Sequence, residues 1–569
     1  MSSRTFTLTL LSLTLLVVLA GVASTSCSSR RLTADLVIRA DAIYTANPAR
    51  PKAEAVAVRA GRIIDVGRRS KINRLIGRQT TVLDYDGVVL PGLIDAHGHL
   101  ASLGRSLSMI DLVGTTSKQE VRDKVVQAMA GSGPDEWILG RGWDQNDWSD
   151  QQFPDYSDLR GTESRPVVLW RVDGHAIWVN RTALRIVGIT SATRNPAGGK
   201  ILHDASGEPT GVLIDNAVDL VTSQMPKEDA ALRRKYLEAG MKECNRYGLV
   251  GIGDAGVDSL GLAVYRDLAE KSELTLRVYA MLDGTDPVFA EQEMLRGPQG
   301  GSSDMLRVRA VKMFADGALG SRGAALLQPY SDDTTNYGLI TTPREKLARM
   351  TSLAIDRGFQ VCVHAIGDSA NRTVLDVYRA ALLGRNHEDY RLRIEHAQIL
   401  DTLDIPRFGK LGVIASMQPT HATSDMPWVE ERLGPERTKE GAYVWKSLLD
   451  SGARLCFGSD FPVESPNPLL GLYAAVTRQD TSGNPPGGWM PEQRLTMEQA
   501  LDGFTIGAAY AEFAERVGGS IEKGKHADFT VIDTDPFKSE PKALVDAKVL
   551  ATIVNGDVVY EREEKPRKR

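Results

Sequence analysis

Hydrophobic and polar positions at the two ends of the chain follow a strand-like pattern. Residues 33–90 hold short β-type runs, such as 55–59, separated by tight turns, with no helix long enough to close a parallel βαβ unit. A similar pattern returns in residues 516–562, where the apolar run 549–554 precedes Asn555-Gly556, a typical hairpin turn. We therefore predict that the two segments combine into one small β-sandwich.

Between these segments, short apolar strands alternate with helical patterns such as 344–357, in which apolar residues recur at spacings of three and four. This alternation indicates a parallel sheet of the α/β class. The candidate strands cover residues 90–97, 249–253, 276–280, 308–312, 360–364, 392–396, 412–416 and 454–458. Eight strands are the number of a (β/α)8 TIM barrel, which we place at residues 91–515. Pro91-Gly92 would then pass the chain from the sandwich to the barrel.

The gap between the first and second barrel strands is too long for a single helix. Residues about 103–240 must therefore form an insertion, and they contain strand-like runs of their own. Five of the eight tryptophans of the chain lie there, at positions 137, 143, 148, 170 and 178. One interpretation is that Trp143, with Arg141 and Asp144, contacts a partly aromatic or apolar substrate. The alternative is that the tryptophans pack the core of the insertion.

Four histidines, one lysine and one aspartate follow the predicted barrel strands, at the ends where barrel enzymes carry their catalytic groups. The residues are His97, His99, Lys312, His364, His396 and Asp460. His97 and His99 are two residues apart, so on a strand both imidazoles face the same side and can bind one ion. Singly, each residue has a structural alternative, such as a core histidine or a helix-capping aspartate. Four of the nine histidines at three strand ends favour one shared metal site.

Longer motifs around these residues resemble one known family. They are Leu90-Pro-Gly-Leu-Ile-Asp-Ala-His-Gly-His99, Gly142-Trp-Asp-Gln145, Asp173-Gly-His175, Val311-Lys-Met-Phe-Ala-Asp-Gly-Ala-Leu-Gly-Ser321, Val363-His-Ala-Ile-Gly-Asp368, Ile394-Glu-His-Ala397 and Gly458-Ser-Asp-Phe-Pro-Val463. The set is similar to the amidohydrolase superfamily, in its N-substituted formamide deformylase-like branch (YtcJ-type, amidohydrolase family 3). The resemblance extends over residues about 35–560 and implies the same barrel and β-sandwich.

The resemblance also implies a divalent metal centre, with zinc as the expected ion. His97, His99 and Asp460 would hold one ion, and His364 and His396 a second. Lys312 would be carbamylated by CO₂ and bridge the two ions, since a cationic lysine cannot bind a metal; without that modification the site would hold one ion. Asp95 and Glu395 adjoin these residues and either orient them or face the barrel wall.

The implied reaction is hydrolysis of a C–N bond, other than a peptide bond, in an amide or N-formyl-type substrate by a metal-activated hydroxide. Asp460 would transfer the proton to the leaving nitrogen. His175 and His421 resemble family positions near the substrate and would stabilise the oxyanion, with a structural role as the alternative. The competing hypotheses are an N-acyl deacylase, a cyclic-amide hydrolase, and a non-catalytic metal-loaded regulatory or binding protein. The complete ligand set argues against the last of these.

The N-terminus is typical of an export signal. Arg4 precedes an almost uncharged run, 5–26, whose apolar centre is short and contains Thr and Ser, so we expect a cleaved signal peptide at residues 1–26 rather than a membrane anchor. Cys27 after a small residue resembles a lipoprotein attachment site, although Ser24 stands where an aliphatic residue is usual. Cleavage near Ala23 is the alternative. We expect a membrane-anchored lipoprotein or a periplasmic or secreted protein.

Net charge and cysteine content restrict the classes of molecule that the protein can be expected to bind. A net charge of −5 and a pI near 6.1 give no electrostatic case for nucleic-acid binding. Four cysteines are too few for a disulfide scaffold. We expect a small-molecule amide as the substrate, and the sequence leaves both a monomer and an oligomer open. His203, His387 and His526 are expected to lie in exposed loops.

Overall fold

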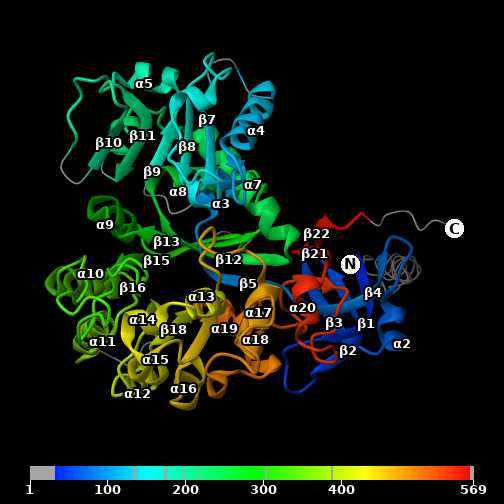
Figure 1. Ribbon diagram of the computed structural model, residues 1–569. Helices are drawn as coiled ribbons and strands as arrows, with labels where there is room; N and C mark the ends of the chain where they lie inside the picture. Colours follow the sequence, from blue (N-terminus) through cyan, green and yellow to red (C-terminus); the bar gives the residue numbers. More distant parts are fainter. Residues whose placement is uncertain are drawn as a thin grey trace, which may run out of the picture.

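The computed structural model describes residues 33–131, 133, 136–171, 176–196, 199–215, 217–300, 304–385 and 389–563. The predicted signal peptide and Cys27 lie outside these residues. Figure 1 shows a central barrel that carries two separate lobes: the insertion, and a β-domain made from both ends of the chain. None of the described helices is long and apolar enough to cross a membrane.

The β-domain is one seven-stranded sheet. Its strands, in the order β22-β21-β20-β4-β1-β2-β3, are Asp557–Glu561, Val549–Val554, Phe529–Ile532, Thr81–Pro91, Leu36–Tyr44, Lys52–Arg59 and Arg62–Gly67. Antiparallel pairing of β4 with β20 joins the two ends of the chain. The sheet folds onto itself, so that Gly61 in the β2–β3 turn lies against Asn555 in the β21–β22 turn. Ile38, Val56 and Phe529 share the core between its two halves.

The barrel contains the eight predicted strands in sequential order. They are β5 (Leu93–Gly98), β12 (Leu249–Val257), β13 (Arg277–Asp283), β15 (Leu306–Phe314), β16 (Gln360–Ala365), β17 (Arg393–His396), β18 (Ile414–Met417) and β19 (Arg454–Phe457). All neighbouring pairs are parallel, and the short β14 (Gln299–Gly300) pairs antiparallel with β15. Beyond the last strand, the N–H of Asp460 donates to the carbonyl oxygen of His97 at 2.8 Å, which brings the two edges together. The barrel prediction is therefore confirmed.

The start of the first barrel strand differs from the prediction. Leu90 belongs to β4 of the β-domain, and the barrel strand begins at Leu93. Pro91-Gly92 lies at this boundary, as expected. A Cβ atom on Gly92 would lie 2.4 Å from Val250 Cγ2, so only glycine fits where the chain passes between the two sheets.

Helices surround the barrel and fill the connections. The layer comprises α3 (Leu100–Leu107), α7 (Ala230–Arg246), α8 (Ser259–Glu270), α9 (Pro287–Leu295), α10 (Arg344–Asp356), α11 (Asp368–Leu382), α12 (Ile405–Leu411), α13 (Pro419–Asp425), α14 (Val429–Leu433), α15 (Pro435–Gly441), α16 (Trp445–Asp450), α17 (Pro468–Thr477), α18 (Met497–Gly503) and α19 (Ile506–Ala511). The short α2 (Arg69–Ile72) and α20 (Ala543–Asp546) lie between strands of the β-domain.

The insertion has its own six-stranded sheet. The order β10-β11-β9-β8-β7-β6 corresponds to Gly199–His203, Pro209–Asp215, Ala176–Val179, Val167–Arg171, Ile138–Trp143 and Ile110–Asp111, with α4 (Lys118–Ala130), α5 (Arg181–Val187) and α6 (Asp219–Thr222). A Cβ on Gly104 of α3 would lie 1.7 Å from the carbonyl oxygen of Tyr236, so α3 and α7 pack backbone to backbone. Both helices belong to the barrel layer, and the insertion between them is therefore shorter than the predicted 103–240.

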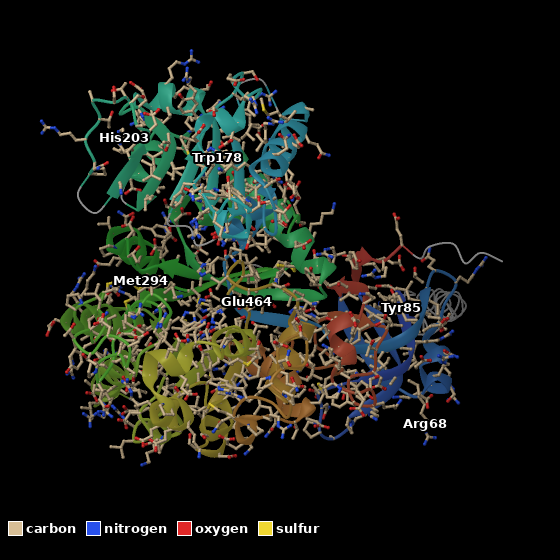
Figure 2. The ribbon with its side chains drawn as sticks, viewed as in Figure 1. Arg68, Tyr85, Trp178, His203, Met294 and Glu464 are labelled. Atoms are coloured by element: carbon tan, nitrogen blue, oxygen red, sulfur yellow. The ribbon has the colours of Figure 1, made fainter. Side chains whose placement is uncertain are left out.

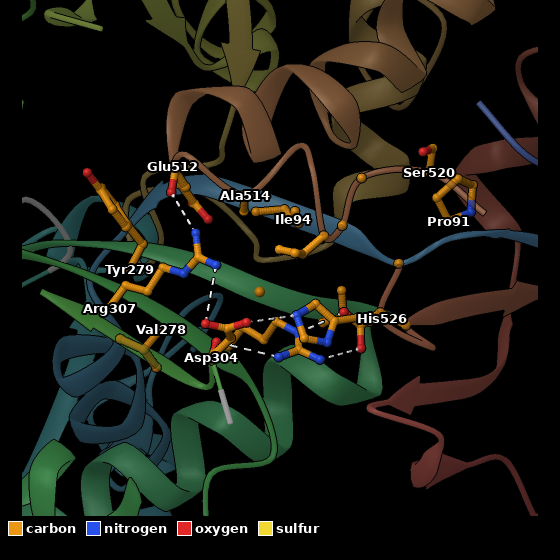
Figure 3. A pocket seen from close by; sticks show the side chains of 18 residues that line it. Pro91, Ile94, Val278, Tyr279, Asp304, Arg307, Glu512, Ala514, Ser520 and His526 are labelled. Carbon is orange, nitrogen blue, oxygen red and sulfur yellow. Dashed lines mark hydrogen bonds and ion pairs between the residues drawn. The ribbon is translucent and has the colours of Figure 1, made fainter. Parts of the chain in front are cut away.

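Partly buried charged residues lie between the base of the barrel and the β-domain (Figure 3). Arg277 of β13 makes a bidentate ion pair with Asp528, at 2.7 and 3.0 Å. His526 is only 4% exposed and lies 3.4 Å from Asp304, so the expectation of an exposed loop histidine was wrong. Its partners come from distant segments, which local sequence does not reveal. Burial raises the pKa of Glu512, at the edge of the same cavity, to about 8.

Candidate active site

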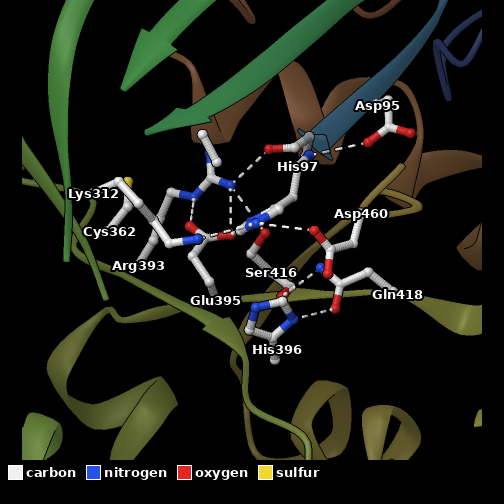
Figure 4. Close-up of polar contacts among 12 residues, drawn as sticks. Asp95, His97, Lys312, Cys362, Arg393, Glu395, His396, Ser416, Gln418 and Asp460 are labelled. Atoms are coloured by element: carbon white, nitrogen blue, oxygen red, sulfur yellow. Dashed lines mark hydrogen bonds and ion pairs between the residues drawn. The ribbon is translucent and has the colours of Figure 1, made fainter. Parts of the chain in front are cut away.

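The predicted metal-binding residues converge at the C-terminal ends of the barrel strands. His97 and His99 come from β5 and its end, Lys312 from β15, His364 from β16 and His396 from β17, and Asp460 follows β19. The ring centroids of His97 and His396 are 5.0 Å apart, and those of His364 and His396 are 4.6 Å apart. Figure 4 shows the ring of His97 between Lys312 and Asp460, with His396 beneath them.

Two groups of three side chains each bring their ligand atoms close enough together to hold an ion. The ligand atoms of His97, His99 and Asp460 all lie within 4.8 Å of one another, and so do those of His396, His421 and Asp460. Asp460 belongs to both groups, because its Oδ1 lies 3.1 Å from His99 Nε2 and its Oδ2 lies 3.9 Å from His421 Nε2. The carboxylate therefore stands between two potential cation sites.

The Nδ1 atoms of three histidines face hydrogen-bond acceptors. Nδ1 of His97 lies 2.5 Å from a carboxylate oxygen of Glu395, and Nδ1 of His99 lies 2.9 Å from the carbonyl oxygen of Ala255. Nδ1 of His396 lies 2.9 Å from the amide oxygen of Gln418. These acceptors select the tautomer with the proton on Nδ1, so the lone pair of each Nε2 points into the site.

The charge states of the cluster fit a divalent cation. Burial lowers the pKa of His97 to about 4 and that of His364 to about 3. These two histidines are therefore neutral at pH 7, the form that binds a metal. The Nε2 atoms of His364 and His421 are buried and have no hydrogen-bond partner among the described residues. Unpaired buried nitrogens are costly unless a ligand satisfies them, so the donor set fits a metal ion.

Lys312 is 1% exposed, and its Nζ lies 3.1 Å from His97 Nε2. Burial lowers the pKa of this amine, although the carboxylates of Glu395 and Asp460 act in the opposite direction. A lowered pKa makes an amine more nucleophilic. Lys312 is therefore better suited to react than a solvent-exposed lysine.

A buried ion pair supports the site from behind. Arg393 donates to Glu395 through Nε (2.8 Å) and Nη2 (3.1 Å), and Glu395 in turn accepts from His97. Burial acts to raise the pKa of Glu395, but the charge of Arg393 and the hydrogen bond from His97 outweigh it and hold the pKa well below its usual range. Asp95 accepts from the backbone N–H of His97 and from the hydroxyl of Ser459 at 2.6 Å. Both acids thus orient the site rather than facing away from it.

The backbone also departs from ordinary geometry at this site. His396 has φ of +74° and Asp460 has φ of +58°, a left-handed conformation that non-glycine residues rarely adopt. Such strain persists where the surrounding structure over-determines it, and it concentrates at functional sites. It sets the direction in which both side chains leave the strand ends.

Sequence reasoning missed two residues of this site, Arg393 and Gln418. Asp316, which lies within the motif that follows Lys312, also belongs to the site, since its Oδ1 lies 3.5 Å from His364 Nε2. Asp316 also accepts the backbone N–H groups of Ile366 and Gly367, at the start of α11. Gln418 follows β18 directly, so applying the strand-end rule to the seventh strand would have found it.

The residues proposed for substrate contact fare differently. His175 lies outside the described residues. Trp143 is fully buried, and its Nε1–H donates to the carbonyl oxygen of Leu169 at 2.8 Å. The prediction that Trp143 contacts the substrate is therefore corrected. Trp143 packs against Trp148 and Trp178 in the core of the insertion, where Figure 2 labels Trp178. Asp144 pairs with Arg171 at 2.7 Å. Arg141 is exposed on β7, and His421 of α13 reaches Asp460.

Comparisons with known proteins agree with this arrangement. Residues 85–560 match the Amidohydrolase family. The chain is 37% identical to the protein LONG AFTER FAR-RED 3 of Arabidopsis thaliana, covering 93% of this chain and 92% of that protein. It is 30% identical to N-substituted formamide deformylase of Arthrobacter pascens, covering 93% and 98% of the two chains. A metal-dependent hydrolase of Pyrococcus furiosus superposes with a TM-score of 0.74 at 28% identity, covering 88% and 100%.

The family match covers most of the chain, and the residues at the strand ends have the arrangement that a metal-dependent hydrolase requires. The expected resemblance is therefore confirmed: this protein is a hydrolase that belongs to the amidohydrolase family, with its site at the mouth of a (β/α)8 barrel.

Proposed function

We propose that the protein hydrolyses a C–N bond, other than a peptide bond, in an amide or N-formyl-type small molecule. The observation that carries the proposal is the position of Asp460, whose two oxygens face His99 and His421 within reach of both candidate cation sites. A relative named for deformylating N-substituted formamides supports the N-formyl class.

In this proposal His97, His99 and Asp460 hold one divalent ion, with zinc the expected element, and His364 and His396 hold a second. Lys312 would contribute to this site as a carbamate formed with CO₂, the form in which a lysine offers anionic oxygens. A bound divalent cation supplies a Lewis acid that polarises a carbonyl and makes water more acidic. The unpaired Nε2 of His364 and the fixed Nδ1 atoms of the other histidines support this distribution.

The side chains of this chain provide the proton transfer. Burial acts to raise the pKa of Asp460, but the surrounding imidazoles outweigh it and hold the pKa well below its usual range, so the carboxylate is ionised. It therefore accepts a proton from the attacking water and delivers it to the leaving nitrogen. Because the proposal assigns the second ion to His364 and His396, His421 is not needed as a ligand. Its Nε2, which faces the same carboxylate, can then donate to the developing oxyanion. His175 has the same proposed role.

The test is turnover of an N-alkylformamide, an N-acylamine and a lactam by the full chain, with metal content measured on the same sample. Asp460→Asn should lower kcat by about 10²–10⁴-fold, while Asp150→Asn, which removes an exposed carboxylate of the insertion, should keep wild-type turnover. Hydrolysis only of the acylamine or the lactam would assign the corresponding alternative. A metal-loaded protein that hydrolyses none of the three would refute the enzyme proposal for amide substrates.

We also propose export of the protein, from its N-terminal sequence alone. Radiolabelled lipid should be incorporated by the wild-type chain and not by Cys27→Ala. Label that persists in the variant would contradict lipid attachment at Cys27, and secretion of an unlabelled, shortened chain would assign ordinary signal cleavage.

A further inference from the structure

A groove leaves the candidate active site along one face of α3. It starts at His99, passes Ser102 and reaches Arg105, and its opposite wall is the end of β12 and the following turn, residues 255–258. The groove holds about 700 Å³ of space, its open side included. Six helical residues from His99 to Arg105 correspond to a length of about 9 Å. Figure 1 shows α3, α7 and α8 gathered at this side of the barrel.

The other charged side chains of the groove already have partners. Arg233 of α7 binds Glu228 through Nε at 2.7 Å, and it binds both oxygens of Asp258 at 2.7 and 3.1 Å. Asp254 accepts from the hydroxyl of Tyr265 at 2.6 Å and from the backbone N–H of Leu100 at 2.9 Å. These carboxylates are therefore engaged within the protein and are not available to a ligand.

Arg105 differs from this set. Over the part of the chain that the structure describes, its guanidinium has no ion pair within 4.0 Å and no hydrogen bond to another side chain, although Glu228 lines the same groove. It is half-buried in the last turn of α3. A cation in the last turn of a helix is favourable in general, and this effect alone could explain an arginine at position 105. It does not explain why the side chain of Arg105 lines a groove that begins at the candidate metal ligand His99.

We infer that Arg105 recognises an anionic group of the substrate, a carboxylate, at the end of the groove distant from the scissile bond. The inference rests on the proposed function, because it takes His99 as one end of the substrate site. A guanidinium binds a carboxylate in a bidentate manner, which gives both affinity and orientation. The substrate class is therefore an N-formyl or N-acyl compound whose amine part ends in a carboxylate.

The test compares 5-formamidopentanoate with the neutral 5-formamidopentanamide, which has the same length. The full metal-loaded chain should prefer the carboxylate in kcat/KM, and Arg105→Gln should lower the carboxylate-to-carboxamide ratio by about tenfold or more. Arg185→Gln, which changes an exposed arginine of α5 in the insertion, should keep the wild-type ratio. An equal ratio in wild type and Arg105→Gln would overturn the inference.

Calorimetric binding of the same two compounds separates this inference from the proposed function. Tighter binding of the carboxylate by wild type, lost in Arg105→Gln, supports the role of Arg105 even where neither compound is hydrolysed. Equal binding of the two compounds by wild type overturns it, even where both are hydrolysed. Circular dichroism of Arg105→Gln checks that α3 keeps its structure.

Discussion

Replacing Glu395 by glutamine tests whether the buried ion pair behind the site controls metal binding. The carboxylate accepts from Nδ1 of His97 and from two nitrogens of Arg393, at 2.5, 2.8 and 3.1 Å. A glutamine has one oxygen and one NH₂ group, so at least one donor of its neighbours would face another donor. Arg393, which is fully buried, would also lose its counter-charge.

The magnitudes follow from these contacts. Removing one partner of a buried ion pair costs about 3–5 kcal/mol of stability, because an uncompensated charge remains. Loss of the carboxylate behind a metal-binding histidine weakens metal affinity by about 10–100-fold. We therefore expect Glu395→Gln to bind zinc at least tenfold more weakly and to unfold at lower denaturant concentration, both with and without metal.

The assay is zinc titration against a competing chelator, with urea unfolding of the metal-free protein in parallel. The double variant Arg393→Met/Glu395→Gln is the control, since it removes the unpaired charge and should recover part of the stability without recovering metal affinity. Zinc affinity of Glu395→Gln within twofold of wild type would refute the idea that Glu395 fixes His97 for metal binding. Loss of stability without loss of affinity would reduce the ion pair to a structural role.

Three further predictions concern the rest of the molecule. Trp143→Ala should destabilise the insertion by about 3–5 kcal/mol, measured by urea unfolding, and should leave substrate affinity unchanged. A small loss of stability together with weaker substrate binding would contradict the place of Trp143 in the core. Burial raises the pKa of Glu512 to about 8 from an ordinary value of 4.5, so the contribution of this carboxyl group to stability is complete below pH 4.5 and is lost as pH rises to 8. Glu512→Gln should therefore be more stable than wild type at pH 9 by a few kcal/mol and about equally stable at pH 4.5. Parallel profiles of stability against pH for the two proteins would argue against a neutral Glu512. Gly92→Ala should cost about 1–3 kcal/mol because of the 2.4 Å approach to Val250, whereas Gly131→Ala, with no atom closer than 3.8 Å, should change thermal stability little.

The sequence predicted the barrel and the candidate ligands for one physical reason. A parallel barrel places the C-terminal ends of all its strands at one mouth, so residues at the ends of separate apolar runs must come together. His97, Lys312, His364 and His396 follow from that rule alone. The same rule, applied to the seventh strand, would have yielded Gln418.

The errors have a different origin, since they concern contacts between segments that sequence does not place. A tryptophan at position 143 is compatible with a substrate pocket and with a hydrophobic core. The strands that pack around Trp143 decide between the two and place it in the core. His526 lies in a loop by its sequence, but Asp304 of the barrel covers it. Arg393 lies within a predicted strand and no motif points to it, but its guanidinium crosses the barrel interior to the carbonyl oxygen of Ala96.

The pairing of β4 with β20 has a consequence for how the protein acquires its structure during synthesis. One edge of β4 is covered by β1 as soon as residues 36–91 leave the ribosome, but its other edge waits for residues 529–532, more than 400 positions later. At a translation rate of about 5–20 residues per second, that edge stays open for some tens of seconds. An open strand edge is a template for pairing with other chains. The β-domain is therefore the last part of the molecule to complete its folding, and it can do so only after the whole barrel has been synthesised.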